Sequence, residues 1–276
     1  MNDSGWNRLG RSLKAALQAA GDILWPPVCS VCPRSLTLID DPLSPAGYFC
    51  EECLEKVEFL PPEVCPVCAR PLYDSPGGHV CGDCLAEPPA FQRARSAAAY
   101  EGPVGLAVSR LKYTGDLSQV AALTALAQRV VRPPDGGLDD DAVISGLGEK
   151  YDLIIPMPIS RPRLNQRGFN QAAELARSLY RPWRGLINEA VLIRKADNER
   201  NSGLAALSAD ERRRAIRGLF SVTAPEMIKG ARVLLFDDVL TTGATAGEAA
   251  RTLMTAGAAS VELVTVARTV LRAWRR

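Results

Sequence analysis

The stretch that decides the fold is VLLFDDVLTTGATAGEA, which runs from Val233 to Ala249. It begins with four consecutive apolar residues that end at Phe236, a pattern typical of a parallel strand with helices on both faces. Asp237 and Asp238 follow directly. Because side chains alternate between the faces of a strand, both aspartates would bury a charge if the strand continued. We therefore expect the strand to end there, with the aspartates at its carboxyl edge, where open α/β sheets bind ligands.

A loop of small and hydroxyl-bearing residues follows the aspartates and leads into a predicted helix. It consists of Thr241, Thr242, Gly243, Ala244 and Thr245. Thr245 and Glu248 also fit the Thr-x-x-Glu pattern of a helix capping box. Backbone amides, hydroxyls and a helix N-terminus together form a natural anion site. The loop lacks the Gly-Lys-Ser/Thr ending of a nucleotide triphosphate P-loop. We therefore predict a site for a single phosphate.

The paired carboxylates beside this loop indicate what else the ligand carries. Asp237 and Asp238 suit two neighbouring hydroxyl groups, as on a ribose, with a divalent cation nearby. A phosphate next to a diol describes a ribose 5-phosphate. The alternative is a capped helix after a tight turn, with both aspartates solvated.

Strands and helices alternate on both sides of this stretch. YDLIIPMPIS, residues 151–160, predicts a buried strand, and NQAAELARSLY, residues 170–180, predicts a helix with an apolar stripe. GEAARTLMTAG predicts a further helix before the strand SVELVTVAR, residues 260–268. This alternation predicts an α/β fold with a parallel sheet flanked by helices.

All eight cysteines precede residue 90 and form four Cys-x-x-Cys pairs. They are Cys29 and Cys32, Cys50 and Cys53, Cys65 and Cys68, and Cys81 and Cys84. Two such pairs supply the four thiolates of a tetrahedral Zn²⁺ site, so the pattern predicts two closed, structural zinc ions. Pairing along the chain assigns the first four cysteines to one ion and the last four to the other, and the spacing also allows a crossed arrangement. Disulfides are the alternative, and they would suit a secreted protein.

The whole chain has 276 residues and a formal net charge of +2, which by itself argues for neither nucleic acid nor membrane binding. No run approaches the roughly 20 apolar residues of a spanning helix, and the N-terminus lacks the features of a signal peptide. We therefore expect a cytoplasmic protein whose N-terminal amphipathic helix packs on its body. The loss of the cysteine pattern divides it into residues 1–90 and 91–276. We interpret His79, the only histidine, as an exposed loop residue.

DDVLTTGAT matches the phosphoribosyl pyrophosphate (PRPP) signature of the type I phosphoribosyltransferases position for position. The chain more specifically resembles the ComF family of competence-associated proteins, in which a cysteine-rich zinc module precedes a phosphoribosyltransferase-like domain. The resemblance also covers GDILWPPVCSVC, YEGPVGLAVSRLKYTGD and PMPISRPRLNQRGFNQ, and so extends over nearly the whole chain.

This resemblance implies roles for the residues that match. Asp237 and Asp238 would be the catalytic residues that hold the ribose hydroxyls, and residues 241–245 would hold the 5-phosphate. The basic turn with Arg161, Arg163 and Arg167 would receive pyrophosphate, with Mg²⁺ as cofactor; its alternative is a solvated basic turn. The implied reaction is pentosyl transfer from PRPP.

The polar stretch from Arg194 to Arg217 would take the place of the hood that closes over the substrate. Where family members carry a glutamine before a Gly-Leu-Ser-like turn and an asparagine before the next strand, this chain has GLAALS and ERRRAIRGLF. Two functions therefore stay open. One is a phosphoribosyltransferase associated with DNA uptake in natural competence. The other is a catalytically inactive zinc-containing module that binds DNA or proteins, with single-stranded DNA and competence proteins such as a helicase as partners.

Overall fold

The computed structural model describes residues 27–36, 41, 44–73, 78–131, 150–195 and 216–270. The predicted N-terminal amphipathic helix and residues 196–215 of the hood stretch lie outside these ranges. None of the helices in the described part of the chain combines the length and the apolar character needed to cross a bilayer.

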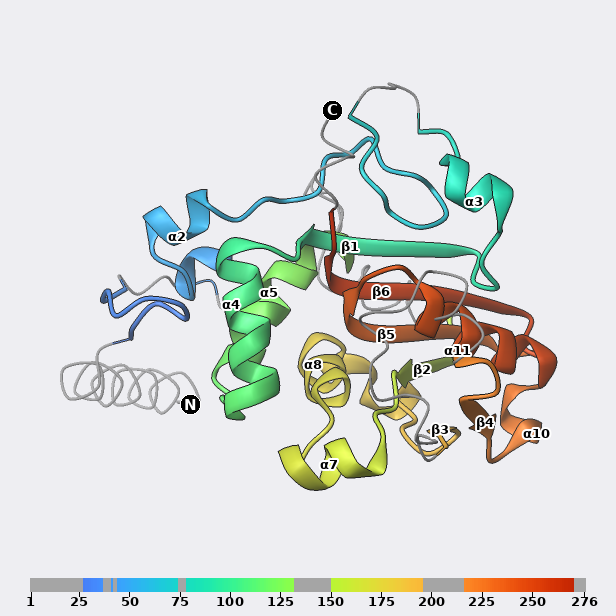
Figure 1. Cartoon of the computed structure of the whole chain (residues 1–276). Coiled ribbons are helices and arrows are strands. Elements are labelled where there is room, and N and C mark those ends of the chain that lie inside the picture. The colour runs from blue at the N-terminus through green and yellow to red at the C-terminus, as the bar shows by residue number, and fades with distance from the viewer. Residues whose placement is uncertain are drawn as a thin grey trace, which may run out of the picture.

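A four-stranded sheet with the order β1-β6-β5-β2 forms the centre of the molecule (Figure 1). All three neighbouring pairs of strands are parallel, which confirms the predicted α/β fold. The strands are β1 (Arg93–Ala99), β2 (Leu153–Pro156), β5 (Arg232–Leu240) and β6 (Ser260–Arg268). A separate antiparallel pair consists of β3 (Leu192–Arg194) and β4 (Phe220–Val222).

Helices cover both faces of the sheet. The longer ones are α4 (Gly102–Ser109), α5 (Gln119–Val131), α8 (Gln171–Leu179) and α11 (Ala244–Thr255). The shorter ones are α2 (Glu51–Glu55), α3 (Gly82–Ala86), α7 (Arg161–Arg167) and α10 (Pro225–Ile228). Three further turns are η1 (Pro45–Gly47), the π-helix η2 (Arg110–Thr114) and η3 (Arg181–Leu186). The apolar faces of α5 and α8 pack against each other and against the strands, whereas α11 contacts β4, β5 and β6.

The direction of the connections changes in the middle of the sheet. The chain passes from β1 through α5 to β2, and from β2 through α8 to Ile187, which pairs in parallel with Ile154 of β2. From β5 it returns through α11 to β6, in the opposite direction. Right-handed crossovers therefore place α5 and α8 on one face and α11 on the other. The chain leaves β2 and β5 in opposite directions, which makes the carboxyl ends of these two strands the topological switch point, where ligands bind.

Strand β5 is longer than the sequence predicts. It continues through Asp237 and Asp238 to Leu240, so the expectation that it ends at the aspartates is wrong. Its pairing with β2 stops at Phe236, whereas its pairing with β6 continues to Leu240. Within the described ranges, no strand therefore pairs with that side of β5 beyond Phe236. The aspartates lie at the carboxyl end of the sheet without ending the strand.

The cysteine-bearing N-terminal part packs on the edge of the sheet. Phe59 bridges Ala98 of β1, and on either side the backbone of residues 58–60 bonds to Ala97 and Ala99 at 3.1 and 2.8 Å. Phe49 is buried in the core that contains the sheet residues. This segment therefore covers the β1 edge that β6 leaves open. The domain boundary at residue 90 stays a prediction.

Candidate functional site

A cavity of about 340 Å³ lies at the switch point between β5 and β2. It brings together residues of the predicted ribose 5-phosphate site and of the predicted pyrophosphate turn. They are Asp237, Asp238, Thr241, Gly243 and Thr245 from the first, and Arg163 from the second. Thr242 and Ala244 belong to the same loop but lie outside the lining. Arg194, the first residue of the predicted hood stretch, also lines this cavity.

A buried ion pair lies in the cavity wall. The ammonium Nζ of Lys112, in η2, is 2.5 Å from Oδ2 of Asp238, and the side chain of Asp238 is only 3% exposed. Burial favours neutral lysine, but the Asp238 carboxylate outweighs it and raises the pKa of Lys112. Sequence reasoning missed Lys112. Its available signal was a single lysine in the apolar stretch that leads into Tyr113-Thr114-Gly115.

Asp237 has a different environment from its neighbour. Its side chain is half-buried in the cavity wall, and its Oδ1 accepts a hydrogen bond from the amide of Asp238 at 2.9 Å. Burial and the adjacent Asp238 carboxylate raise the pKa of Asp237 well above its usual value. Asp238 therefore has its own cation, whereas the charge of Asp237 is held at a cost in free energy.

The N-terminus of α11 is formed by the predicted phosphate loop. Gly243 precedes the helix with a φ of 82°, in the left-handed region that glycine adopts without strain. The predicted capping box is wrong, because Glu248 does not turn back toward Thr245. Its carboxylate accepts hydrogen bonds from the amide of Gly218 at 2.5 Å and from the guanidinium of Arg251. Glu248 thus fixes α11 to the segment before β4.

A second cavity of about 420 Å³ adjoins the first and shares Lys112, Arg163 and Gln171 with it. Arg167 and Tyr113 also line it. The guanidinium of Arg167 donates to Oε1 of Gln171 at 2.7 Å and lies 5.8 Å from the centroid of the Tyr113 ring. The described lining carries basic side chains and no acidic ones, so it suits an anion.

The third arginine of the basic turn lies elsewhere. Arg161 is exposed at the start of α7, outside the lining of both cavities. The structure therefore brings Arg163 and Arg167 to the cavities and leaves Arg161 in solvent. Sequence reasoning missed Tyr113 and Gln171, because neither residue type is a signal for an anion site.

Asn170 fixes the segment that carries these arginines, which runs from the end of β2 through α7 to the start of α8. Its side-chain oxygen accepts from the amide of Ala172 at 3.0 Å and so caps α8. Its side-chain nitrogen donates to the carbonyl of Met157 at 3.1 Å, directly after β2. One asparagine therefore connects the strand end, the helix α8 and the cavity wall.

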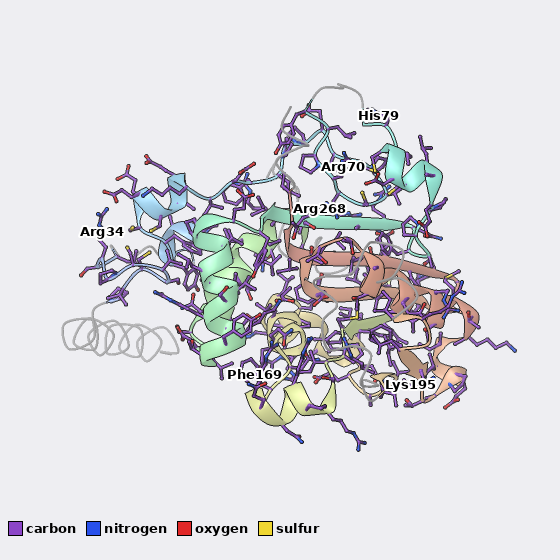
Figure 2. All side chains as sticks on the ribbon, viewed as in Figure 1. Arg34, Arg70, His79, Phe169, Lys195 and Arg268 are labelled. Carbon is purple, nitrogen blue, oxygen red and sulfur yellow. The ribbon has the colours of Figure 1, made fainter. Side chains whose placement is uncertain are left out.

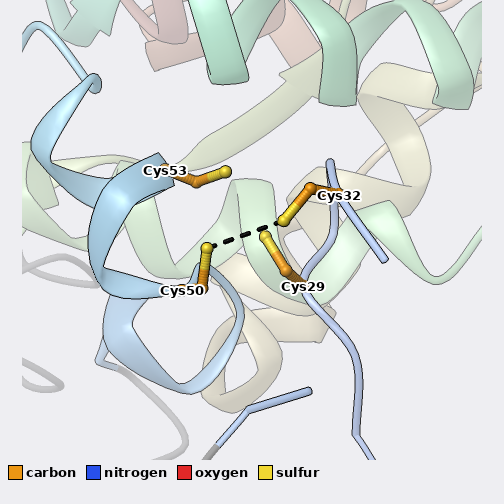
Figure 3. A group of neighbouring side chains, drawn as sticks. All are labelled: Cys29, Cys32, Cys50 and Cys53. Atoms are coloured by element: carbon orange, nitrogen blue, oxygen red, sulfur yellow. Dashed lines mark hydrogen bonds between the residues drawn. The ribbon is translucent and has the colours of Figure 1, made fainter. Parts of the chain in front are cut away.

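The eight cysteines form two groups, in pairing order along the chain. Within each group, made up of the first four cysteines or the last four, the sulfur atoms all lie within 4.8 Å of one another. Figure 3 shows the first group converging, with Cys32 and Cys50 Sγ atoms 3.6 Å apart. Zinc–sulfur bonds of about 2.3 Å in a tetrahedron separate the sulfurs by about 3.8 Å. The groups therefore fit structural Zn²⁺, and the sequential arrangement is the one that forms.

The second cysteine group is joined to the sheet. Arg268 lies at the end of β6 (Figure 2). Its Nη2 is 3.6 Å from Cys68 Sγ, and the residue is 4% exposed. The carbonyl of Arg268 accepts a hydrogen bond from the amide of Tyr100, which lines the first cavity. His79 is exposed, as predicted, and belongs to neither cysteine group.

Comparison with known proteins agrees with this arrangement. A double zinc ribbon domain matches residues 20–85, and a phosphoribosyl transferase domain matches residues 164–272. The DNA utilization protein YhgH of Salmonella typhi is 32% identical over 219 residues, which cover 75% of this chain and 91% of the relative. Competence protein ComFC of Bacillus subtilis is 30% identical over 234 residues, 82% of this chain and 86% of the relative. Competence protein F of Haemophilus influenzae is 26% identical over 220 residues, 79% and 90% respectively. With relatives of this similarity along at least three quarters of its length, the chain belongs to the ComF family.

Proposed function

We propose that the protein binds PRPP, or a closely related ribose phosphate, at the switch-point cavity. The observation that carries this proposal is that Asp237, Asp238 and the loop at the start of α11 line one cavity with Arg163. In the bound state the aspartates accept hydrogen bonds from the ribose hydroxyls. The loop of residues 241–245 holds the 5-phosphate at a helix N-terminus through Thr241, Gly243 and Thr245, the three of its members that line the cavity.

The second cavity takes the pyrophosphate group. Arg163 and Lys112 lie between the two cavities, and Arg167 lies in the second. Guanidinium groups hold phosphates in bidentate fashion, so they neutralise charge and fix orientation. The carboxylate of Asp237 suits Mg²⁺, which prefers carboxylate and phosphate oxygens and supplies charge stabilisation to the pyrophosphate when it is bound. Lys112 already neutralises Asp238, so Asp237 is the carboxylate available to the ion.

The same contacts would support transfer of the ribosyl group. The bond from ribose C1 to the pyrophosphate oxygen breaks, and its electron pair leaves with pyrophosphate. A lone pair of the acceptor forms the new bond to C1, and the acceptor proton passes to solvent. Arg163 and Arg167 stabilise the departing negative charge, and the carboxylate of Asp237, which Lys112 does not neutralise, stabilises the positive charge that develops on the ribose.

PRPP binding is tested by calorimetry with Mg²⁺ on the wild type and Asp237→Asn. We expect the variant to lose about ten- to a hundredfold in affinity, because a hydrogen bond to a charged group contributes about 1.5–3 kcal/mol and each 1.4 kcal/mol is tenfold. Asp152→Asn is the matched control, since Asp152 pairs with Arg232 at the amino end of the strands, at 2.9 Å. Equal PRPP affinity in all three proteins, or none in the wild type, would contradict the proposal.

Pyrophosphate release decides between the two functions that share this site. The wild type is incubated with PRPP, Mg²⁺ and a panel of nucleobases, with Asp237→Asn as the blank. Release above the blank identifies a transferase. Binding without release by any acceptor identifies a binding module with an intact PRPP site.

We further propose that the protein acts in DNA uptake or utilisation in the cytoplasm, together with competence proteins such as a helicase. The names of its relatives, a DNA utilization protein and two competence proteins, support the link to DNA uptake or utilisation. On the protein itself, α7 exposes Arg161 and Arg163, and the ring-bearing side chain of Tyr113 is 77% exposed. Basic groups that follow a phosphate backbone, with aromatic rings on which bases stack, are what single-stranded DNA binding requires.

Single-stranded DNA binding is tested with a labelled oligonucleotide over a salt series. We expect affinity to fall with salt, and Arg161→Ala to reduce the slope of log affinity against log salt by about 0.7, the value for one lost phosphate contact. PRPP affinity should not change, because Arg161 lies outside both cavities. Arg232→Ala, at the opposite end of the strands, should bind DNA as the wild type does. A salt-independent affinity would exclude this mode of binding.

A further inference from the structure

The π-helix η2 lies between the first cysteine group and the switch-point cavity. On one side, Arg110 extends to the loop between Cys29 and Cys32. Its Nη1 donates to the carbonyl of Ser30, and its Nη2 donates to the carbonyl of Val31 at 3.2 Å. Ser30 and Val31 are the two residues that separate the first pair of cysteines. One guanidinium therefore holds both carbonyls of the loop that carries two thiol ligands.

The backbone of Arg110 also closes η2. Its carbonyl accepts hydrogen bonds from the amide of Gly115, five residues later, and from the hydroxyl of Thr114 at 2.7 Å. Gly115 ends the turn with a φ of 69°. Segments of π-helix are rare and frequently occur at functional sites. Arg110 thus fixes the shape of η2 through its backbone and the position of η2 through its side chain.

Lys112 leaves η2 toward the cavity. Residues two apart on a helix do not face the same way, so anchoring Arg110 on the cysteine loop directs Lys112 elsewhere. Its ammonium reaches Asp238, and the next residue, Tyr113, lines the second cavity. The segment is therefore held by the cysteine loop on one side and contributes residues to both cavities on the other.

We propose that Arg110 is a positioning residue through which the first cysteine group holds Lys112 against Asp238. The four sulfurs of that group fit Zn²⁺, which would lock the Ser30–Val31 carbonyls in the orientation that Arg110 meets. Where the inference concerns PRPP affinity it rests on the proposed function. Where it concerns the environment of Lys112 it does not.

The test compares Arg110→Met with Arg129→Met in the full-length, zinc-loaded protein. Arg129 is the matched control, because its guanidinium lies 4.0 Å from the ring centroid of Phe59 and so also joins the N-terminal part to α5, away from Lys112. The first readout is the rate at which Lys112 is acetylated, measured by mass spectrometry against the exposed Lys229. Lys112 should react several-fold faster in Arg110→Met and at the wild-type rate in Arg129→Met. The second readout, PRPP affinity, should fall only in Arg110→Met.

Zinc content and melting temperature are measured on the same samples. Retained zinc in Arg110→Met, with a faster reaction at Lys112, assigns the effect to lost positioning. The inference is overturned if Lys112 is acetylated at the same rate in the two variants. It is also overturned if that rate increases only in proportion to the zinc that the protein loses. If the wild type binds no PRPP while Lys112 still responds to Arg110→Met, the proposed function fails and the positioning role stands.

Discussion

At the scale of single residues, the ion pair between Lys112 and Asp238 determines how the site can hold two adjacent aspartates. Lys112 is 18% exposed in its side chain and Asp238 is 3% exposed, so neither charge is well solvated. A buried charge without a partner is strongly unfavourable, whereas a paired one is tolerated. Lys112 therefore allows Asp238 to stay inside a strand that the sequence pattern alone would end.

Lys112→Met tests this dependence. Because it leaves the Asp238 carboxylate buried and unpaired, we expect the free energy of unfolding to fall by about 3–5 kcal/mol. Adding Asp238→Asn, which removes the remaining charge, should restore much of the loss. Urea unfolding of the two single variants and the double variant gives the coupling energy. Additive losses would show that the two side chains act independently.

Asp237 has the opposite effect on stability. Its pKa is raised in the folded protein, so between the unfolded value, about 4, and the folded value, the unfolded state releases its proton first and stability falls as pH rises. Asp237→Asn removes this cost. We expect the variant to match the wild type near pH 4 and to have the higher melting temperature at neutral pH, where the wild type has lost the stability that its protonated Asp237 contributes. Calorimetric scans from pH 4 to 8 measure the difference, and a lower melting temperature for the variant at neutral pH would contradict it.

At the scale of single elements, the two glycines near the start of α11 have different roles. Gly243 has a φ of 82°, and a Cβ there would lie 3.7 Å from the side chain of Leu240. Gly247 lies inside the helix with open space around it. Gly243→Ala should cost roughly 1–2 kcal/mol, the penalty of a left-handed conformation. Gly247→Ala should stabilise the helix by up to about 1 kcal/mol.

Chemical unfolding of both variants, followed by phosphate and PRPP titration, checks this contrast. We expect only Gly243→Ala to weaken ligand binding, because only Gly243 lies in the cavity lining. Equal stability changes in the two variants would mean that the backbone of the loop is not constrained as described.

The sequence predicts the elements well where their signals are local. The apolar run before Asp237 is a central parallel strand, and the cysteine spacing predicts two groups of four, although it does not decide between the sequential arrangement that the structure has and a crossed one. The strand end and the capping box are wrong for the same physical reason, which is a distant partner. Lys112 neutralises Asp238, and the amide of Gly218, 30 residues away in the chain, donates to Glu248. No pattern within the stretch from Val233 to Ala249 contains these partners.

At the scale of the whole molecule, the two cysteine groups each contact the walls of the ligand site through one arginine. Arg110 reaches the first group from η2, and Arg268 reaches the second from the end of β6. Phe49 and Val57, which flank the second pair of cysteines, lie in the same core as the sheet. The two cysteine groups therefore help to hold the walls of the ligand site in place.

Removal of zinc by a chelator tests this connection. We expect a lower melting temperature, because structural zinc contributes about 10–16 kcal/mol of apparent binding free energy. We expect one unfolding transition and not two, because the N-terminal part and the sheet share one hydrophobic core. Differential scanning calorimetry with and without chelator measures the number of transitions. An unchanged high-temperature transition in the metal-free protein would show that the sheet is stable without its N-terminal part.

The strip at residues 58–60 that lies along β1 affects how the protein is made. Synthesis runs from the N-terminus, so the ribosome releases this strip before the strand it shields, and β1 before its neighbour β6. The exposed edge of β1 can therefore pair with residues 58–60 as soon as β1 is synthesised, before β6 is available. A truncated protein that begins near residue 90 would leave the edge of β1 uncovered, and we expect it to aggregate in vitro.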